Sequence, residues 1–162
     1  FSGKTLLPVI HRHANLIVLR TFSKAYGMAA LRVGIMIANP AWIKCVEKVR
    51  LPYNVNAFSQ LAAARTIRDS DRLREQVQVI LKERTGLLAA LSASDRFEPF
   101  RTDANFILFR ACEGADTVFA HLVSAGILVC NLNRSGQLAD CLRVTVGTPK
   151  ENGAFLAALG LG

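Results

Sequence analysis

The sequence lacks any long hydrophobic run. None of its apolar stretches approaches the roughly 18 residues that a membrane-spanning helix needs, so we expect no membrane partner. The opening residues, Phe1-Ser2-Gly3-Lys4, lead into neither the apolar region nor the cleavage site of a signal peptide. An initiator methionine is also absent, and the first clear element is already a hydrophobic run at residues 15–20. The opening therefore resembles the middle of a longer chain.

Cysteine pairs of the kind that bind zinc are absent as well. The four cysteines are spread through apolar or strand-like contexts, with no CxxC pair and no histidine cluster beside them. We therefore expect no metal site. Scattered thiols fit a reducing compartment, in which a buried cysteine behaves as a small hydrophobic residue, so we expect a cytoplasmic protein.

Acidic residues are scarce beside basic ones. The chain has 12 Asp and Glu against 20 Lys and Arg, a formal net charge of +8. A basic domain can bind nucleic acid through clustered Lys and Arg side chains. Here the basic residues are dispersed, and the densest group, between residues 65 and 84, is interleaved with aspartates and glutamates. This pattern favours a solvated helix face with ion pairs, so we expect no nucleic-acid partner.

Hydrophobic periodicity predicts a folded α/β chain with strands and helices in alternation. Short apolar, β-branched runs predict strands at residues 15–20, 33–38, 105–110, 127–130 and 142–147, the first of them buried. Helices are expected at 39–50, at 57–92 with a break at 69–71, at 115–125 before Gly126, and at 149–159. The last third of the chain is therefore expected to form a compact lobe with a small sheet.

The segment TFSKAYGMAALRVG lies between two predicted strands, where a lysine is unusual because Lys is rarely buried without a partner. Thr21 and Ser23 flank Lys24, and Arg32 follows just before the next strand. Hydroxyl groups and an arginine fork suit a phosphate group. A partly deprotonated lysine amine beside that phosphate can condense with an aldehyde. The alternative is an ordinary connection with an exposed lysine and a structural arginine, and spacing alone leaves the two readings equal.

The same segment resembles the cofactor segment of fold type I aminotransferases of classes I and II, which bind pyridoxal 5'-phosphate (PLP). Together with LPYNVNAFSQ, DANFILFR and CLRVTVGTPKEN, it resembles the histidinol-phosphate aminotransferase family over about residues 4–159. The resemblance implies three parts. Residues 1–56 would be the C-terminal part of the large PLP-binding domain, 57–96 the linker helices, and 97–162 the small C-terminal α/β domain.

The resemblance also implies roles for single residues. Lys24 would bind PLP covalently and then move a proton between the substrate Cα and the cofactor's C4′. Arg32 would pair with the cofactor phosphate, supported by Thr21 and Ser23 as donors. Arg143 would bind the anionic group of the substrate, which is either the carboxylate of glutamate or 2-oxoglutarate or the phosphate of histidinol phosphate.

Two of these positions have structural alternatives. An arginine that enters a strand, such as Arg143, can also cap a sheet edge or pair with a nearby acid, here Asp140. Tyr53 and Asn54 lie in the loop PYNVN, which the resemblance places near the active site, as a substrate-binding element, or near the dimer interface. A turn that merely connects two helices is an equally weighted reading of that loop.

The sequence departs from the family in two respects. It contains neither the upstream glycine-rich loop nor the Asn, Asp and Tyr that complete the family's cofactor site, so it resembles the C-terminal portion of the enzyme. We therefore expect the 162-residue chain alone to be inactive in transamination. Relatives commonly carry a basic residue where this chain has Cys130, although Arg134 lies close enough in sequence to compensate.

The leading expectation is thus a PLP-dependent aminotransferase. Its substrates would be a small-molecule amino donor, histidinol phosphate, and a 2-oxo acid, 2-oxoglutarate, in histidine biosynthesis, and the enzyme would be a homodimer. Cys130 leaves open another PLP enzyme of the same fold, such as an aromatic amino-acid aminotransferase or a phosphothreonine-type decarboxylase. A basic, non-catalytic binding module is the alternative from a different class.

Overall fold

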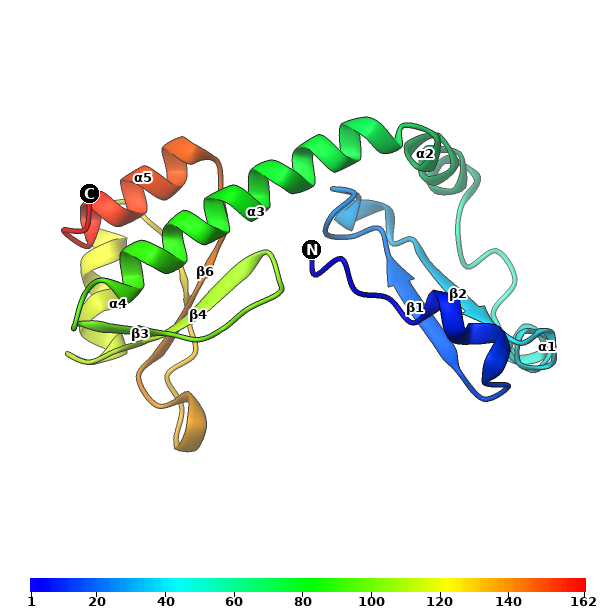
Figure 1. Cartoon of the computed structure of the whole chain (residues 1–162), viewed down its shortest axis with the longest axis horizontal. Helices are drawn as coiled ribbons and strands as arrows, with labels where there is room; N and C mark the ends of the chain where they lie inside the picture. The colour runs from blue at the N-terminus through cyan, green and yellow to red at the C-terminus, as the bar shows by residue number, and fades with distance from the viewer. The chain divides into compact units, whose positions relative to one another are not determined.

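The computed structural model describes residues 1–162, except for the side chain of Ser70. The chain divides into two compact units, Ser2–Gln76 and Val77–Gly162, each with its own antiparallel sheet (Figure 1). Helix α3 (Ser70–Ser92) begins in the first unit and ends in the second. The mixture of helices and strands agrees with the α/β class that the sequence predicts.

The first unit contains a two-stranded sheet of β1 (Ile17–Thr21) and β2 (Gly34–Ala38), which pair along their full length. Both predicted strands are therefore confirmed. The prediction that residues 15–20 are buried is wrong, since four of the five residues of β1 are exposed and Leu19 is 72% exposed. β-branched apolar residues favour an extended backbone, but burial also requires a packing partner, which the described residues do not supply for most of this strand.

Short helical segments complete the first unit. They are the 3-10 helices η1 (Leu7–Arg12) and η2 (Ala29–Leu31) and the α-helices α1 (Pro40–Val49) and α2 (Ala57–Arg68). The predicted cap of α1 is confirmed, because Asn39 Oδ1 accepts a hydrogen bond from Ala41 N at 3.0 Å. The predicted break at 69–71 is also confirmed, because α2 ends at Arg68 and α3 begins at Ser70.

The second unit is a four-stranded antiparallel sheet in the order β3-β4-β6-β5. Its elements are β3 (Phe97–Pro99), β4 (Phe106–Ala111), α4 (Ala115–Ser124), β5 (Cys130–Asn131), η3 (Gly136–Leu138), β6 (Cys141–Thr145) and α5 (Pro149–Ala158). β3 is missing from the predicted elements because it is short and ends in proline. It is an edge strand, where a missing N–H donor is tolerated.

The predicted strand at 127–130 is wrong in its extent, because pairing with β6 covers only Cys130 and Asn131. The physical reason lies at the end of α4. Gly126 adopts φ +77°, as its predicted role as a left-handed helix stop requires, and Ile127 N donates to Leu122 O at 2.8 Å. Because this amide closes the helix, the apolar residues that follow it do not begin a ladder with β6.

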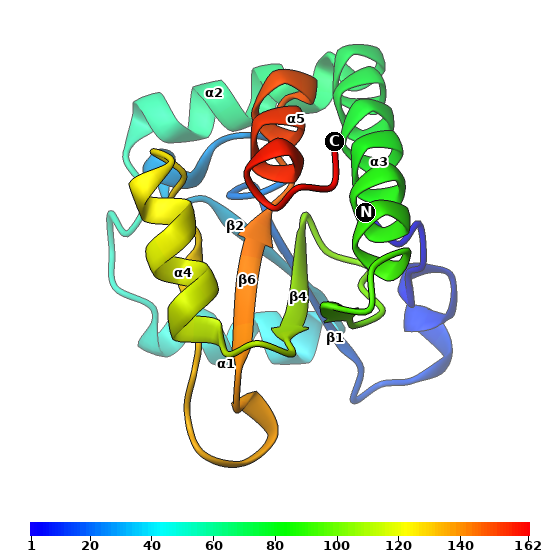
Figure 2. The same cartoon turned by 90° about the vertical axis from the view of Figure 1, so that its left-hand side faces the viewer.

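The two faces of the second sheet differ in character. Alternate residues of β4 are fully buried, and α4, α5 and the C-terminal part of α3 cover this face (Figure 2). Leu87, Leu122 and Phe155, one from each helix, belong to the same buried cluster as Ile107 and Phe109 of the sheet. Full burial of each such side chain stabilises the fold by about 1.5–3 kcal/mol.

The opposite face of this sheet is only half-buried. Cross-strand partners share a face, and Arg143 of β6 pairs with Leu108 on one side and with Cys130 on the other. We call this surface the Arg143 face. It carries Glu98, Phe106, Leu108, Arg110, Cys130, Cys141, Arg143 and Thr145, of which Cys141 alone is fully buried. The helices of the second unit therefore leave this side of the sheet for other contacts.

Close packing fixes the turn that follows β6. Thr148 and Glu151 form a capping box, in which Thr148 N donates to Glu151 Oε2 at 2.8 Å and Glu151 N donates to Thr148 Oγ1 at 3.3 Å. The hydrogen bonds from the Thr148 backbone and hydroxyl lower the pKa of Glu151 below its ordinary value. A Cβ at Gly147 would lie 2.8 Å from Glu151 Oε2, so a larger residue here would displace the Glu151 side chain from the capping box.

Asn152 links this turn to α3 through a buried side chain. Its Nδ2 donates to Glu83 Oε2 at 2.8 Å and to Gly147 O at 3.0 Å, while its Oδ1 accepts from Gly147 N at 2.9 Å. The side chain is only 5% exposed, so water does not replace these partners readily. The segment VGTPKEN thus forms a rigid turn between β6 and α5.

Replacing Asn152 by alanine is expected to lower the free energy of unfolding by about 1–3 kcal/mol, because the partly buried N–H and C=O of Gly147 would lose their partners. Urea unfolding measures the loss. Lys150→Ala, at an exposed position of the same helix, is the matched control and should change stability by less than about 0.5 kcal/mol. Equal stability of the two variants would contradict a structural role for the Asn152 hydrogen bonds.

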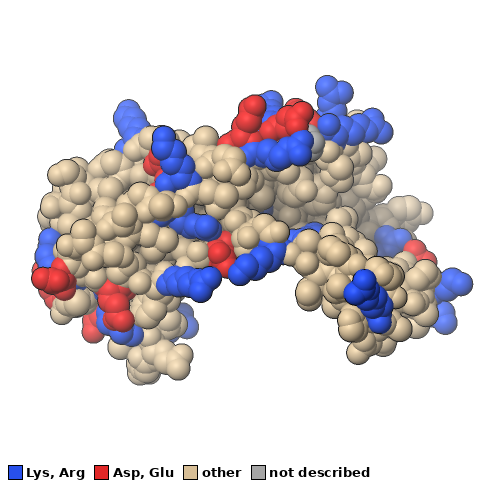
Figure 3. Space-filling view, viewed as in Figure 1, with Lys and Arg blue, Asp and Glu red and all other residues tan. Residues whose placement is uncertain are grey.

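The side of the chain drawn in Figure 3 shows no continuous basic stripe. No helix among the described residues combines the length and apolarity that crossing a bilayer requires. Lys and Arg side chains on the drawn face are scattered among other residues, and several lie beside Asp and Glu. The ion pair between Arg74 and Asp71 on α3 belongs to the mixed-charge segment that the sequence predicts as a solvated helix face.

Candidate functional site

Lys24 lies on a tight turn between β1 and η2. Gly27 N donates to Lys24 O at 2.9 Å, and Met28 N donates to Phe22 O at 3.0 Å. Gly27 adopts φ +65°, a conformation that glycine reaches without strain. The side chain of Lys24 is exposed at the tip of this turn.

Buried residues on both sides hold the base of the turn. Phe22 is 2% exposed and packs with Met28 in a small cluster that includes Ala63 of α2. The Phe22 ring also lies 4.5 Å from the ring of Tyr26, measured between centroids. The backbone of the turn is thus fixed by side chains other than Lys24, which leaves the amine available for chemistry.

The β1–β2 ladder brings the other polar residues of this segment together. Thr21 pairs with Gly34, and Phe22 N donates to Val33 O at 3.1 Å, so Ser23 and Arg32 follow at the next step on opposite sides of the connection. Ser23 N donates to Thr21 Oγ1 at 3.1 Å. The ladder therefore places the backbones of Thr21, Ser23 and Arg32 at the base of the Lys24 turn.

Arg32 has a strained backbone. It adopts φ +55°, and its Nη1 donates to Ala29 O at 2.9 Å. For a residue with a Cβ this left-handed conformation costs about 1–2 kcal/mol. Such strain persists where the surrounding structure or a function demands it. A guanidinium in the same connection as the hydroxyls of Thr21 and Ser23 is a donor set that suits a phosphate ester.

Arg143 is the second predicted site residue whose surroundings the structure defines. Its Cζ lies 5.3 Å from the centroid of the Phe106 ring, a cation–π contact within the Arg143 face. Within the described part of the chain its guanidinium forms no ion pair or hydrogen bond. Asp140, the alternative partner, instead accepts a hydrogen bond from Ala115 N at 3.3 Å through Oδ1.

Arg110, on the same face, differs from Arg143 because its guanidinium has partners within the fold. Its Nη1 donates to Glu98 Oε2 at 2.9 Å, its Nε to Ala139 O at 3.1 Å, and its Nη2 to Gln137 O at 3.2 Å. Every arm of this guanidinium is engaged within the fold. Arg110 is therefore a structural arginine, whereas Arg143 is available for an anion.

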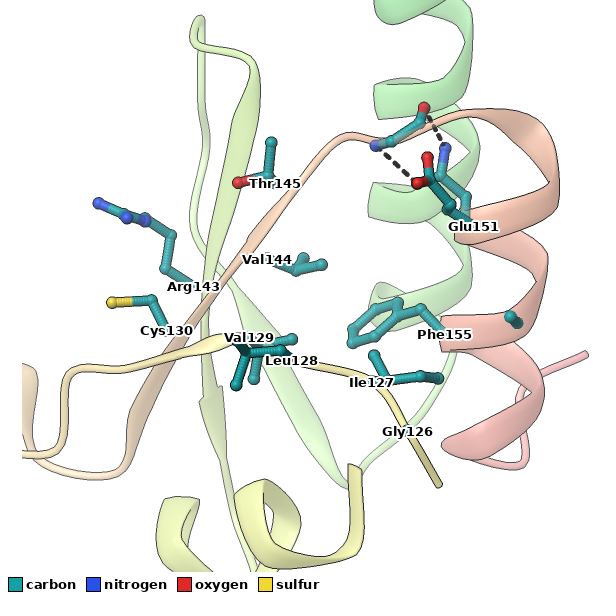
Figure 4. A pocket seen from close by; sticks show the side chains of 13 residues that line it. Gly126, Ile127, Leu128, Val129, Cys130, Arg143, Val144, Thr145, Glu151 and Phe155 are labelled. Atoms are coloured by element: carbon teal, nitrogen blue, oxygen red, sulfur yellow. Dashed lines mark hydrogen bonds between the residues drawn. The ribbon is translucent and has the colours of Figure 1, made fainter. Parts of the chain in front are cut away.

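A cavity of about 520 Å³ adjoins Arg143 between β6, the segment before β5 and the start of α5 (Figure 4). The side chains of Arg143 and Cys130 point to the same side, away from Val144 and Phe155. Arg143 is the single cation that lines this cavity, and the single carboxylate is Glu151 of the capping box.

Tyr53 and Asn54 lie on the loop between α1 and α2. Tyr53 is 97% exposed and adopts φ +60°, and Asn54 Oδ1 accepts a hydrogen bond from Arg50 Nη1 at 2.8 Å. No hydrogen bond in the described chain joins either residue to the Lys24 turn. Their substrate-binding role stays a prediction.

Sequence reasoning missed two residues that shape the second unit's site. Phe106 lies beneath Arg143, and Asn152 fixes the turn beyond it. The signal for Asn152 was local, since a Gly-Thr-Pro stop followed by Glu and Asn predicts a capped helix start. Phe106 depends on the register between β4 and β6, which no local pattern encodes.

Comparison with known proteins gives a consistent family. Residues 2–159 match the family described as "Aminotransferase class I and II". Histidinol-phosphate aminotransferase 2 of Nitrosococcus oceani is 45% identical over 164 residues, which covers 100% of this chain and 45% of that protein. Histidinol-phosphate aminotransferase 1 of Carboxydothermus hydrogenoformans is 41% identical over 99% of this chain and 45% of its own length.

Solved structures agree with the sequence relatives. The histidinol-phosphate aminotransferase of Clostridium acetobutylicum superposes with a TM-score of 0.88 at 25% identity, over 98% of this chain and 50% of that chain. The enzyme of Sinorhizobium meliloti, solved in complex with PLP, gives a TM-score of 0.78 at 27% identity, over 90% of this chain and 40% of that chain. The chain thus spans about half the length of the curated relatives and solved structures that it matches.

Proposed function

Because the chain belongs to the aminotransferase class I and II family, we propose that it supplies the cofactor lysine and the substrate-anion arginine of a PLP-dependent transaminase. The observation that carries the proposal is the Lys24 turn. An exposed amine stands on a backbone fixed by Phe22 and Met28, with the strained Arg32 at its base. This is the donor set that a phosphate ester with an aldehyde group needs.

When bound, PLP supplies an electron sink for the bonds at the substrate Cα. Lys24 would hold the cofactor through its amine and, once released, move a proton to and from the substrate Cα. Arg32 would bind the phosphate through its guanidinium, and Thr21 and Ser23 would donate their hydroxyl protons to phosphate oxygens. The fixed turn limits how far the Lys24 amine travels between these two tasks.

Arg143 would bind the carboxylate of glutamate or 2-oxoglutarate. A guanidinium engages a carboxylate through two parallel hydrogen bonds, and the Arg143 guanidinium has no competing partner in the described chain. Tyr53 and Asn54 would lie near the substrate or at the subunit interface. The exposed aromatic ring of Tyr53 supports such a contact, because it buries little against its own chain.

For the whole protein that carries this chain, we propose transfer of an amino group from histidinol phosphate to 2-oxoglutarate in histidine biosynthesis. The named activities of the curated relatives, at 35–45% identity, support this reaction. A homodimer in the cytoplasm completes the proposal, which includes no membrane or nucleic-acid partner.

An assay with a panel of amino donors tests this function. The whole protein, supplied with PLP and 2-oxoglutarate, should form glutamate with a kcat/KM at least about tenfold higher for histidinol phosphate than for phenylalanine or tyrosine, a difference of about 1.4 kcal/mol in transition-state binding. Faster turnover of the aromatic donors would favour an aromatic aminotransferase. Release of carbon dioxide from phosphothreonine would favour a decarboxylase, and turnover of no donor would refute the proposal.

A further inference from the structure

A second cavity lies where α2 meets α3 in the first unit. Its volume is about 410 Å³, which is within the range of sites that bind small molecules. Its lining residues are Tyr26, Arg65, Thr66, Asp69, Arg72, Leu73 and Gln76. None of them has a role in the function proposed above, so this cavity has no assigned occupant.

The junction of the two helices forms the body of this cavity. Asp69 alone separates α2 from α3, and its N–H donates to Thr66 O at 3.2 Å. Thr66 and Leu73, one from each helix, are half-buried, whereas Arg65, Asp69 and Arg72 are exposed. The cavity therefore combines partly buried side chains with charged groups that a ligand can reach.

Tyr26 lines the cavity from a different element, the turn that carries Lys24. Its ring packs against Phe22, with 4.5 Å between the ring centroids, and Phe22 is 2% exposed. The half-buried Tyr26 is thus held in place without a ligand. A helix face open to solvent has no such wall, which distinguishes this part of the two helices from their outer surface.

The three charged groups of the cavity have no partner among the described residues. The guanidinium groups of Arg65 and Arg72 and the carboxylate of Asp69 form neither an ion pair nor a side-chain hydrogen bond there. The nearby acid Asp71 is paired with Arg74 instead. A ligand in the cavity therefore meets two guanidinium groups and one carboxylate, a net charge of +1.

We propose that this cavity binds an acidic amino acid, a molecule that carries two carboxylates and one ammonium group. Arg65 and Arg72 each engage one carboxylate through two parallel hydrogen bonds, and Asp69 pairs with the ammonium group. The single net negative charge of such a ligand complements the net positive charge of the cavity. A dicarboxylate or a phosphate without an amine brings a second anion against Asp69, and like charges in contact are unfavourable.

Glutamate and glutarate are the probes that test this inference, since both carry two carboxylates on the same carbon chain and only glutamate carries an ammonium group. Their binding is measured by calorimetry on the whole protein with the Arg143→Ala substitution and with the cofactor in its amine form. The proposed substrate site then contributes neither binding nor turnover. Glutamate should bind at least about tenfold more tightly than glutarate, a difference of about 1.4 kcal/mol.

Substitutions in the cavity assign the role of each charge. Arg65→Gln and Arg72→Gln should each weaken the binding of both probes by at least about tenfold. Asp69→Asn should bring the two affinities within about twofold, because it removes both the partner of the ammonium group and the repulsion of glutarate. Arg68→Gln, an exposed position of α2 outside the lining, is the matched control and should change neither affinity by more than about twofold.

The absence of saturable glutamate binding in this background would overturn the inference. Glutarate that binds as tightly as glutamate, or an equal weakening in Arg68→Gln, would overturn it as well. Transamination by the unsubstituted protein is measured separately, so a failure of this inference is distinguishable from a failure of the proposed function.

Discussion

Replacement of Lys24 by alanine is expected to abolish covalent retention of PLP and to lower transamination by the whole protein by at least about 10²–10⁴-fold, the usual contribution of a positioned general base. Lys24→Arg should lose covalent retention of PLP and transamination to the same extent, because a guanidinium stays protonated and does not condense with an aldehyde. Both effects are measured on purified protein by the visible absorbance of the bound cofactor and by glutamate formation.

The turn itself should survive the substitution. Phe22 and Met28 hold its base, and the hydrogen bond from Gly27 N uses the backbone carbonyl of Lys24 rather than its side chain. The free energy of unfolding of Lys24→Ala should therefore stay within about 0.5 kcal/mol of wild type. Lys44→Ala, at an exposed position of α1, is the control that should keep full activity. Full activity in Lys24→Ala would contradict the catalytic assignment.

Replacement of Arg143 by alanine is expected to raise the KM for 2-oxoglutarate by about 10²-fold, since hydrogen bonds to a charged group contribute about 1.5–3 kcal/mol each. Retention of PLP should be nearly unchanged, because none of the predicted cofactor contacts lies on β6. Stability should also change little, since within the described chain the guanidinium of Arg143 forms a cation–π contact with Phe106 but no hydrogen bond or ion pair. Steady-state kinetics, the visible absorbance of the bound cofactor and urea unfolding measure the three effects.

Arg110→Ala is the matched control for this experiment. The two arginines lie on the same face of neighbouring strands, but Arg110 holds Glu98 and the carbonyls of Ala139 and Gln137. The Arg110→Ala substitution should lower the free energy of unfolding by about 1–2 kcal/mol and leave the KM for 2-oxoglutarate unchanged. An unchanged KM in Arg143→Ala, or an equal rise in both variants, would mean that Arg143 has no selective role in anion binding.

Arg110 has partners within the fold and Arg143 is available for an anion, a difference that local sequence patterns do not predict. Features that depend on a few neighbouring residues are predicted correctly. Asn39 caps α1, Gly126 ends α4 in the left-handed conformation, and α2 gives way to α3 at Asp69. The Lys24 segment is also local in sequence, because its lysine, hydroxyls and arginine lie within one short connection, but its role in cofactor binding stays a prediction.

Features that depend on distant pairing are not predicted. The sequence alone does not distinguish Arg110 from Arg143, because the engagement of Arg110 comes from β3 and from the loop before β6. The extent of β5 depends on how α4 ends, since Ile127 N is used by that helix. The exposure of β1 depends on tertiary packing, which the apolar character of residues 15–20 does not fix.

The most direct test of the central claim is to locate the cofactor on the chain. The whole protein is incubated with PLP, reduced with borohydride, digested and analysed by mass spectrometry for the pyridoxyl group. The label is expected on the peptide that contains Lys24, within Thr21-Phe22-Ser23-Lys24. Label confined to exposed lysines such as Lys44 or Lys82, with Lys24 unmodified, would contradict it.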